Sequence, residues 1–195
     1  MPPKQAPQKK ESHNAECFKK LPLAVSFAAL QHRNEMSHYD EISSGYDELH
    51  LDEQLKKCQL ISEHFDPKNK KILDVGCGTG IATDFFKCDT GVDPSEKQLE
   101  IAGKKFPHIQ FIQASAEALP FDENEFDAVI SLTAIQNFDD IEKGLSEIKR
   151  AGNEFVLTFL KRSEKRQVIE EAIKRLFEIR KEIEEEKDII FFCGK

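Results

Sequence analysis

One short stretch, "KILDVGCGTGIATDFF" (71–86), constrains the fold more than any other part of this 195-residue sequence. An apolar run typical of a buried strand ends at Gly76, and a helical pattern begins just after Gly80. Glycine accepts positive φ values and lets a ligand approach the backbone closely, and the start of a helix exposes amide N–H groups. The stretch therefore predicts a strand, a tight turn and a helix, with a nucleotide-like ligand bound at the turn.

Strand-like and helix-like segments alternate after this turn. Strands are expected over 71–76, 88–93, 109–114, 126–132, 154–160 and 188–194. Helices are expected between them, with Ser95 as the N-cap of one and Asp139 or Asp140 as the N-cap of another. A long helix is expected over about 163–186, so that only one strand follows it. The alternation predicts an α/β fold: a doubly wound, mostly parallel sheet of six strands with helices on both faces.

The first 35 residues differ from the rest of the chain. They are rich in Pro, Gln and Lys and show no periodicity, so we expect residues 1–35 to be a disordered extension and 36–195 to be the folded domain. The apolar run over 21–30 is about half as long as a membrane span requires, and no membrane interaction is expected. A targeting peptide, or a chain that starts at Met36, are the alternatives for this segment.

Composition narrows the classes of function. The net charge of −8 disfavours general binding to nucleic-acid phosphates. The five cysteines are odd in number and form no CxxC or Cys/His cluster, which is typical of reduced thiols in a cytoplasmic protein without a metal site.

The spacing of the three glycines distinguishes between kinds of nucleotide site. Gly76, Gly78 and Gly80 form G-x-G-x-G, whereas a dinucleotide site requires G-x-G-x-x-G and would place a glycine where Ile81 stands. Asp93 ends the next expected strand, 17 residues after Gly76, where a carboxylate can accept hydrogen bonds from both hydroxyls of a ribose. The pattern favours a nucleoside ligand other than a nicotinamide dinucleotide.

Four motifs, "ILDVGCGTG", "GVDPS", "ASAEALPFDENEFDAVIS" and "EIKR", carry a family resemblance. In this order and spacing the chain resembles the class I S-adenosylmethionine-dependent methyltransferases (type 11), and is most similar to their quinone-biosynthesis branch, over about Tyr39 to Leu160. The resemblance implies a Rossmann-like methyltransferase fold, S-adenosylmethionine as cofactor, and transfer of its methyl group to an acceptor.

The resemblance also implies the residues of the cofactor site. These are Tyr46, Asp74, Gly76, Cys77, Gly78, Gly80, Asp93, Pro94, Ala116, Glu117, Ser131 and Leu132. Asp74 and the glycine turn would hold the methionine end, and Asp93 the ribose. Pro94, Ala116 and Glu117 would lie by the adenine, and Ser131 and Leu132 beneath the reacting methyl group. The chain departs from the family in having Ser115 where an aspartate often contacts the adenine amine.

Methyl transfer depends mainly on alignment of donor and acceptor, and a base is needed only when the acceptor loses a proton. The sequence therefore assigns no catalytic residue. Tyr46 is a candidate, because a ring beside a sulfonium is worth about 0.5–2 kcal/mol of cation–π attraction, and Asn137 is a second. Packing or surface roles compete with function for both, and for the weaker candidates Tyr39, Phe138, His38, His50 and His64.

A small-molecule acceptor is expected, because the "SLTA" that follows the fourth strand contains no Asn/Asp-Pro-Pro-aromatic motif of the kind used to methylate amino groups. One alternative is an RNA or protein methyltransferase that depends on a partner, for which the basic cluster "KRSEKR" (161–166) leaves room. Another is a non-catalytic, cofactor-binding scaffold subunit.

Overall fold

The computed structural model describes the backbone of residues 44–195 and the side chains of residues 51–195. The chain divides after Tyr46 into two compact units, and the fold and the site lie in the second unit, Asp47–Lys195. The expected disorder of the first 35 residues, the Tyr39 and His38 candidates, and the side chains of Tyr46 and His50 lie outside the described residues.

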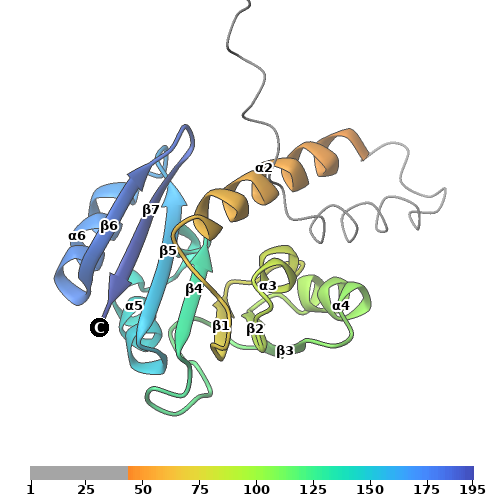
Figure 1. Ribbon diagram of the computed structural model, residues 1–195, viewed down its shortest axis with the longest axis horizontal. Helices are drawn as coiled ribbons and strands as arrows, with labels where there is room; N and C mark the ends of the chain where they lie inside the picture. Colours follow the sequence, from red (N-terminus) through yellow and green to blue (C-terminus); the bar gives the residue numbers. More distant parts are fainter. Residues whose placement is uncertain (1–43) are drawn as a thin grey trace, which may run out of the picture. The chain divides into compact units, whose positions relative to one another are not determined.

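A seven-stranded sheet forms the centre of this unit (Figure 1). The strands run in the order β3-β2-β1-β4-β5-β7-β6 across the sheet, and the first five of this order are parallel. Only β7 is reversed, and it pairs antiparallel with both β5 and β6. Their bounds are β1 Ile72–Val75, β2 Thr90–Asp93, β3 Gln110–Gln113, β4 Ala128–Leu132, β5 Glu154–Leu160, β6 Glu178–Glu184 and β7 Asp188–Gly194. The mostly parallel α/β sheet is confirmed.

The expected six strands and long helix over 163–186 are wrong. Helix α6 covers only Arg166–Leu176, and the chain then turns at the buried Phe177 into the edge strand β6. Ile179 and Ile183 are four residues apart, a spacing that fits one helical turn and also fits one face of a strand. The charged residues between them favoured a helix in the sequence, but they suit an exposed edge strand equally well.

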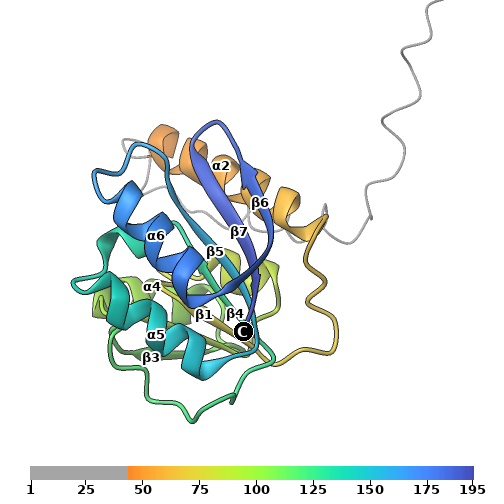
Figure 2. The same ribbon diagram turned by 90° about the vertical axis from the view of Figure 1, so that its left-hand side faces the viewer.

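Side chains alternate between two apolar cores on the two faces of the sheet. Leu73 and Val129 face one core, which contains the buried sides of helices α5 (Ile141–Ala151) and α6. Figure 2 shows these two helices lying together on one face of the sheet. Their neighbours Ile72 and Ile130 face the other core, so the period-2 pattern of buried strands is retained in both.

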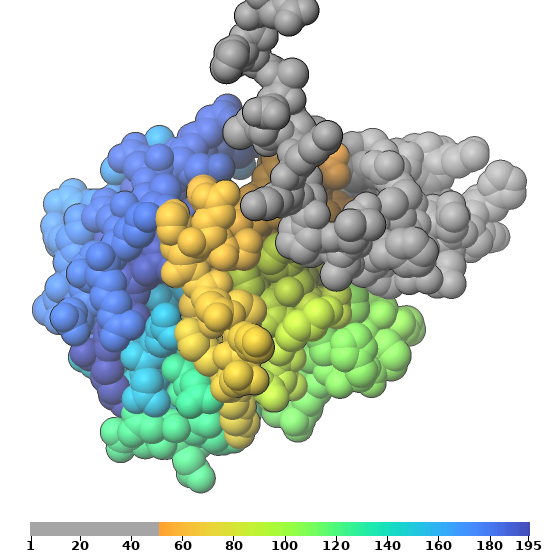
Figure 3. Space-filling model, viewed as in Figure 1, coloured from red at the N-terminus to blue at the C-terminus, as the bar shows by residue number. Residues whose placement is uncertain are grey.

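The second core is closed by the end of helix α2 (Ser44–Ser62) and by the segment that follows it. Cys58 and Ile61 of α2 and Phe65 are all buried there against Phe86, which follows helix α3 (Ile81–Phe85). In Figure 3 the chain from α2 towards β1 is seen running across the surface between the C-terminal strands and the α3–α4 region.

Side-chain caps fix where two of the helices begin. Ser95 caps helix α4 (Glu96–Lys105), because its hydroxyl accepts a hydrogen bond from the Gln98 amide. Of the two candidates for α5, Asp140 is the cap, and its carboxylate accepts from the Lys143 amide at 3.0 Å.

We expect Asp140→Ala to lower the free energy of unfolding by about 1 kcal/mol, because it removes the acceptor at the N-cap. Urea unfolding of the two single variants checks this, with Asp139→Ala as the matched control, since Asp139 makes no cap bond to α5. Equal midpoints for both variants would contradict the assignment of the cap.

The strand order reverses at β1. The chain runs from β1 through β2 to β3 on one side, and then returns to place β4 and β5 on the other. In open parallel sheets the crevice at the carboxyl ends of such neighbouring strands is where ligands bind. The turn after β1 and the loop after β4 meet at this position.

Candidate active site

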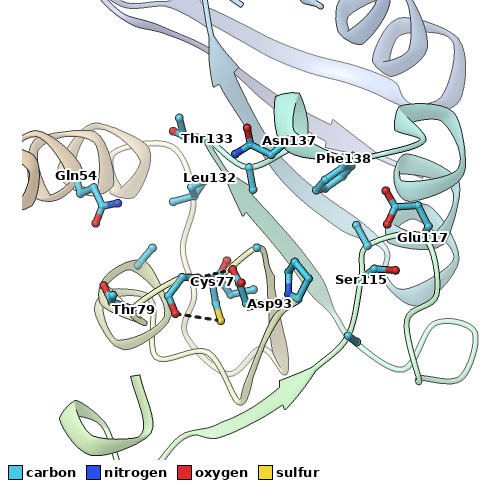
Figure 4. Close-up of a pocket in the computed structure, with 18 of the residues that line it drawn as sticks. Gln54, Cys77, Thr79, Asp93, Ser115, Glu117, Leu132, Thr133, Asn137 and Phe138 are labelled. Atoms are coloured by element: carbon cyan, nitrogen blue, oxygen red, sulfur yellow. Dashed lines mark hydrogen bonds between the residues drawn. The ribbon is translucent and has the colours of Figure 1, made fainter. Parts of the chain in front are cut away.

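A cavity of about 430 Å³ lies at the carboxyl ends of β1, β2 and β4 (Figure 4), a volume within the range of small-molecule sites. Its walls come from α2, the turn after β1, the end of β2, the loop after β3, and the segment from β4 to α5. The lining residues are Gln54, Lys57, Cys58, Asp74, Gly76, Cys77, Gly78, Thr79, Ala82, Asp93, Pro94, Ala114, Ser115, Ala116, Glu117, Leu132, Thr133, Ala134, Asn137, Phe138 and Asp139.

The glycine turn is held in a conformation that other residues rarely adopt. Gly76, Gly78 and Gly80 all have positive φ, at 77°, 53° and 82°. A Cβ on Gly76 would lie 2.3 Å from the Cβ of Ala134, so this glycine is also needed for the approach of the loop after β4. A Cβ on Gly78 would meet nothing within 4 Å, and Gly78 lines the cavity. Its bare backbone is therefore open to a ligand.

Asp93 at the end of β2 joins this turn to the following helix. Its carboxylate accepts from the Gly78 amide at 3.0 Å and from the Ser95 amide at 2.9 Å, one at each oxygen. A carboxylate has about four acceptor positions, so two remain for further donors. The side chain is thus oriented by the backbone and keeps capacity for a ligand with two adjacent hydroxyls.

Asp74 lies deeper, within β1, and is almost fully buried. The Thr83 hydroxyl of α3 donates to its carboxylate at 2.7 Å. Burial raises the pKa of Asp74 from 3.8 to about 7, although the Thr83 hydrogen bond opposes the shift and the charge of Asp93 adds to it. A cation beside this carboxyl would favour its ionised form.

Most residues predicted for the cofactor site lie together at this cavity. Those that line it are Asp74, Gly76, Cys77, Gly78, Asp93, Pro94, Ala116, Glu117 and Leu132, together with Asn137 and Phe138. Gly80 and Ser131 do not line it. A Cβ on Gly80 would lie 3.0 Å from the rings of Phe106 and Phe111, and the Ser131 hydroxyl is buried without a hydrogen-bond partner. His64 lies elsewhere, against Phe192 and Lys181. The binding roles of the lining residues remain predictions.

Glu117 has a structural task in addition to lining the cavity. Its carboxylate accepts from the amides of Asp139 and Asp140 at 2.9 and 3.2 Å, and so fixes the chain that leads into α5. Phe138 is buried beside it, against Gly144 of α5. Figure 4 shows Glu117, Ser115 and Phe138 on the same side of the cavity.

Several residues that line the cavity were not expected from the sequence. Two of them, Lys57 and Thr133, contact each other in its wall. Thr133 follows β4 and has φ of 58°, a left-handed conformation that is unusual for a β-branched residue. Thr158 of β5 stabilises it, because its hydroxyl accepts from the Thr133 amide at 2.8 Å. Lys57 of α2 donates to the Thr133 hydroxyl. No local pattern in the sequence links these residues, because the sheet brings them together.

The thiols at the cavity are poor nucleophiles. Burial raises the pKa of Cys58 to about 12, and burial also raises the pKa of Cys77 well above its ordinary value. Both therefore remain protonated near neutral pH. Within residues 51–195 no group of three or more His, Cys, Asp or Glu side chains is arranged to hold a metal ion. Over the described part of the chain, no helix has the length and apolar content to span a membrane.

The sequence around this site is similar to a known family of proteins. Residues 73–154 match the family described as a methyltransferase domain. The ubiquinone/menaquinone biosynthesis C-methyltransferase of Campylobacter jejuni is 32% identical over 122 residues, covering 55% of this chain and 52% of that protein. The demethylmenaquinone methyltransferase of Thermotoga maritima is 31% identical over 150 residues, covering 69% and 65%. The chain therefore spans about half to two thirds of the length of these relatives.

Solved structures agree on the fold. A Thermotoga maritima protein, described as an S-adenosylmethionine-dependent methyltransferase and possible histamine N-methyltransferase, superposes with a TM-score of 0.61 over 80% of this chain and 97% of its own, at 18% identity. Residues 73–154 therefore match a methyltransferase domain, and the chain has the fold of the S-adenosylmethionine-dependent methyltransferases. The Rossmann-like methyltransferase fold expected from the motifs is confirmed, and the match to a methyltransferase domain agrees with the expected family.

Proposed function

We propose that the protein transfers a methyl group from S-adenosylmethionine to a small-molecule acceptor. The observation that carries the proposal is a cavity whose lining includes the glycine turn, Asp74, Asp93 and the loop after β4. S-adenosylmethionine supplies a methyl carbon activated by its sulfonium. The protein has to hold donor and acceptor in line and exclude water, which is what a concave site at the carboxyl edge of the sheet can do.

The groups of S-adenosylmethionine fit the residues at hand. The two free acceptor positions of Asp93 suit the adjacent ribose hydroxyls, and Asp74 suits the ammonium of the methionine end. The open space beside Gly78 admits the ligand against the backbone. Ala116 and Glu117 would then lie by the adenine, with Ser115 as a weaker acceptor than the usual aspartate, and Leu132 near the methyl group.

A small-molecule acceptor is favoured over RNA by the state of the basic cluster at 161–166. Lys161 pairs with Glu184 at 2.8 Å, Arg166 pairs with Glu170 at 2.8 Å, and Lys165 donates to the Phe138 carbonyl. Cations already paired with protein groups are less available to bind a phosphate backbone.

The names of the relatives point to quinone precursors as the first acceptors to test. We propose a cytoplasmic location, which the four described cysteines support, because all four are free and buried.

The raised pKa of Asp74 predicts a pH dependence of cofactor binding. Below about pH 7 the carboxyl of the free protein is protonated, and it must lose this proton to bind an ammonium. We therefore expect the affinity for S-adenosylhomocysteine to be about tenfold weaker at about pH 6 than at about pH 8. Calorimetric titration at both pH values measures this. Asp74→Asn should flatten the dependence, and an unchanged slope in that variant would contradict the role given to Asp74.

A methyl-transfer assay tests the proposal itself. The full chain is incubated with S-adenosylmethionine and reduced 1,4-naphthoquinone, a soluble quinol, and the formation of S-adenosylhomocysteine and of methylated product is followed by mass spectrometry. Product that depends on both reactants supports the proposal. Tight cofactor binding without turnover, with this and a broader panel of hydroxylated aromatic acceptors, would favour the scaffold alternative.

A further inference from the structure

A buried ion pair borders the cavity on the side away from Asp93. The Lys57 ammonium of α2 lies 2.6 Å from the Asp188 carboxylate at the start of β7, with the two side chains 12% and 4% exposed. The Thr133 hydroxyl donates to the other oxygen of Asp188 at 3.2 Å, and Lys57 donates to Thr133. Three segments distant in the sequence are thus joined at one point of the wall.

The ammonium group lies at the wall of the cavity. Lys57 and Thr133 both line it, and Figure 4 shows Thr133 and Asn137 across the cavity from Cys77 and Asp93. Asp93 is on the side that fits the ribose, so Thr133 and Lys57 lie on the side left for the acceptor. An ammonium has three N–H donors, and Thr133 and Asp188 take two of them. One donor remains for a ligand.

The charge of this group is unusual for its surroundings. Among the described residues that line the cavity, Lys57 alone carries a positive charge, whereas four are acidic: Asp74, Asp93, Glu117 and Asp139. An anionic acceptor would be repelled by most of this wall and attracted at one point. A hydrogen bond to a charged donor is also among the stronger ones that a ligand can make.

We infer that Lys57, held in position by Asp188 and Thr133, binds an ionised oxygen of the acceptor, as in a phenolate or enolate. This assignment rests on the proposed function, because it presumes that the acceptor occupies the side of the cavity opposite Asp93. Lys57 is then a specificity-determining residue: it selects an acceptor that carries an acidic hydroxyl and sets which atom faces the donor. The ion pair alone would also fasten α2 to the sheet, so the test has to separate binding from stability.

The probe is 4-nitrophenol, whose phenolate is coloured, compared with its methyl ether 4-nitroanisole, which cannot ionise. Both are titrated into the full chain, with and without saturating S-adenosylhomocysteine. We expect 4-nitrophenol to bind as the phenolate, seen in its absorbance, and at least about tenfold more tightly than the ether. No preference in the native protein would overturn the inference without the need for any variant.

Two variants test whether Lys57 causes the preference for the phenolate over the ether. Lys57→Met leaves the buried Asp188 carboxylate without its charged partner, which can unfold the chain, so Lys57→Met/Asp188→Asn removes both charges together. We expect the double variant to bind S-adenosylhomocysteine within about twofold of the native protein and to lose both the preference and the phenolate absorbance. Lys56→Met, an exposed neighbour on α2, should keep them.

The remaining outcomes are distinguishable. A double variant that retains the phenolate preference would overturn the inference. A double variant that loses both S-adenosylhomocysteine binding and the circular dichroism signal of the folded chain would also overturn it, because the ion pair would then serve stability. If the native chain fails to bind S-adenosylhomocysteine but shows a phenolate preference that depends on Lys57, the proposed function fails, and the part of the inference that stands is that Lys57 binds an ionised oxygen.

Discussion

Asp93→Ala should weaken the binding of S-adenosylhomocysteine by about a hundredfold or more. The substitution removes the acceptor for two ligand hydroxyls, and hydrogen bonds to a charged group contribute roughly 1.5–3 kcal/mol each. It also releases the Gly78 amide, which Asp93 holds at 3.0 Å, so the turn loses part of its orientation. Calorimetric titration of the native and variant full chains measures the loss directly.

Two controls separate this effect from general damage. Asp93→Asn keeps one acceptor oxygen without the charge and should fall between the native protein and Asp93→Ala. Asp52→Ala removes an exposed carboxylate from α2 and should leave the affinity unchanged. An Asp93→Ala chain that is folded and binds within about threefold of the native protein would contradict the ribose role.

Gly76→Ala should lower the free energy of unfolding by about 3 kcal/mol. A φ of 77° costs an L-residue about 1–2 kcal/mol, and the new methyl group would lie 2.3 Å from the Ala134 Cβ. Overpacking of this kind typically adds about 1–3 kcal/mol. Urea unfolding, monitored by circular dichroism, gives the midpoint and slope from which the change in the free energy of unfolding is obtained.

Gly103→Ala is the matched control for this prediction. Gly103 lies within helix α4, and a Cβ there would meet nothing within 4 Å. Alanine in a helix is favoured over glycine, so this variant should be more stable by about 0.5–1 kcal/mol. If Gly76→Ala were as stable as the native chain, the close approach between the turn and the loop after β4 would not exist as described.

The contrast between β1 and β6 explains how much of the fold could be predicted. Strand β1 is buried on both faces and is followed by glycines in a left-handed conformation, so burial and turn chemistry agree on its position. Strand β6 has only Ile179 and Ile183 partly buried, and their spacing fits a helix as well as a strand. What decides the matter is pairing with β7, which the local sequence does not contain.

The same distinction applies to the site. Gly78 and Asp93 lie in the turn after one parallel strand and at the end of its neighbour, so the glycine spacing and the alternation of strands and helices were enough to predict that they meet. Asp74 was expected there from the family resemblance. Lys57 and Asp188 come from a helix before the sheet and from its reversed strand. Their contact depends on where α2 lies and on the direction of β7, and neither follows from spacing or periodicity.

Binding of S-adenosylmethionine in the cavity at the glycine turn is measured by calorimetric titration of S-adenosylmethionine and S-adenosylhomocysteine into the full native chain. We expect both to bind to one site per chain with micromolar affinity, and each to compete with the other. Absence of binding by a chain whose circular dichroism shows it to be folded would mean that this cavity is not a cofactor site, since the turn, Asp74 and Asp93 would then be present without the ligand.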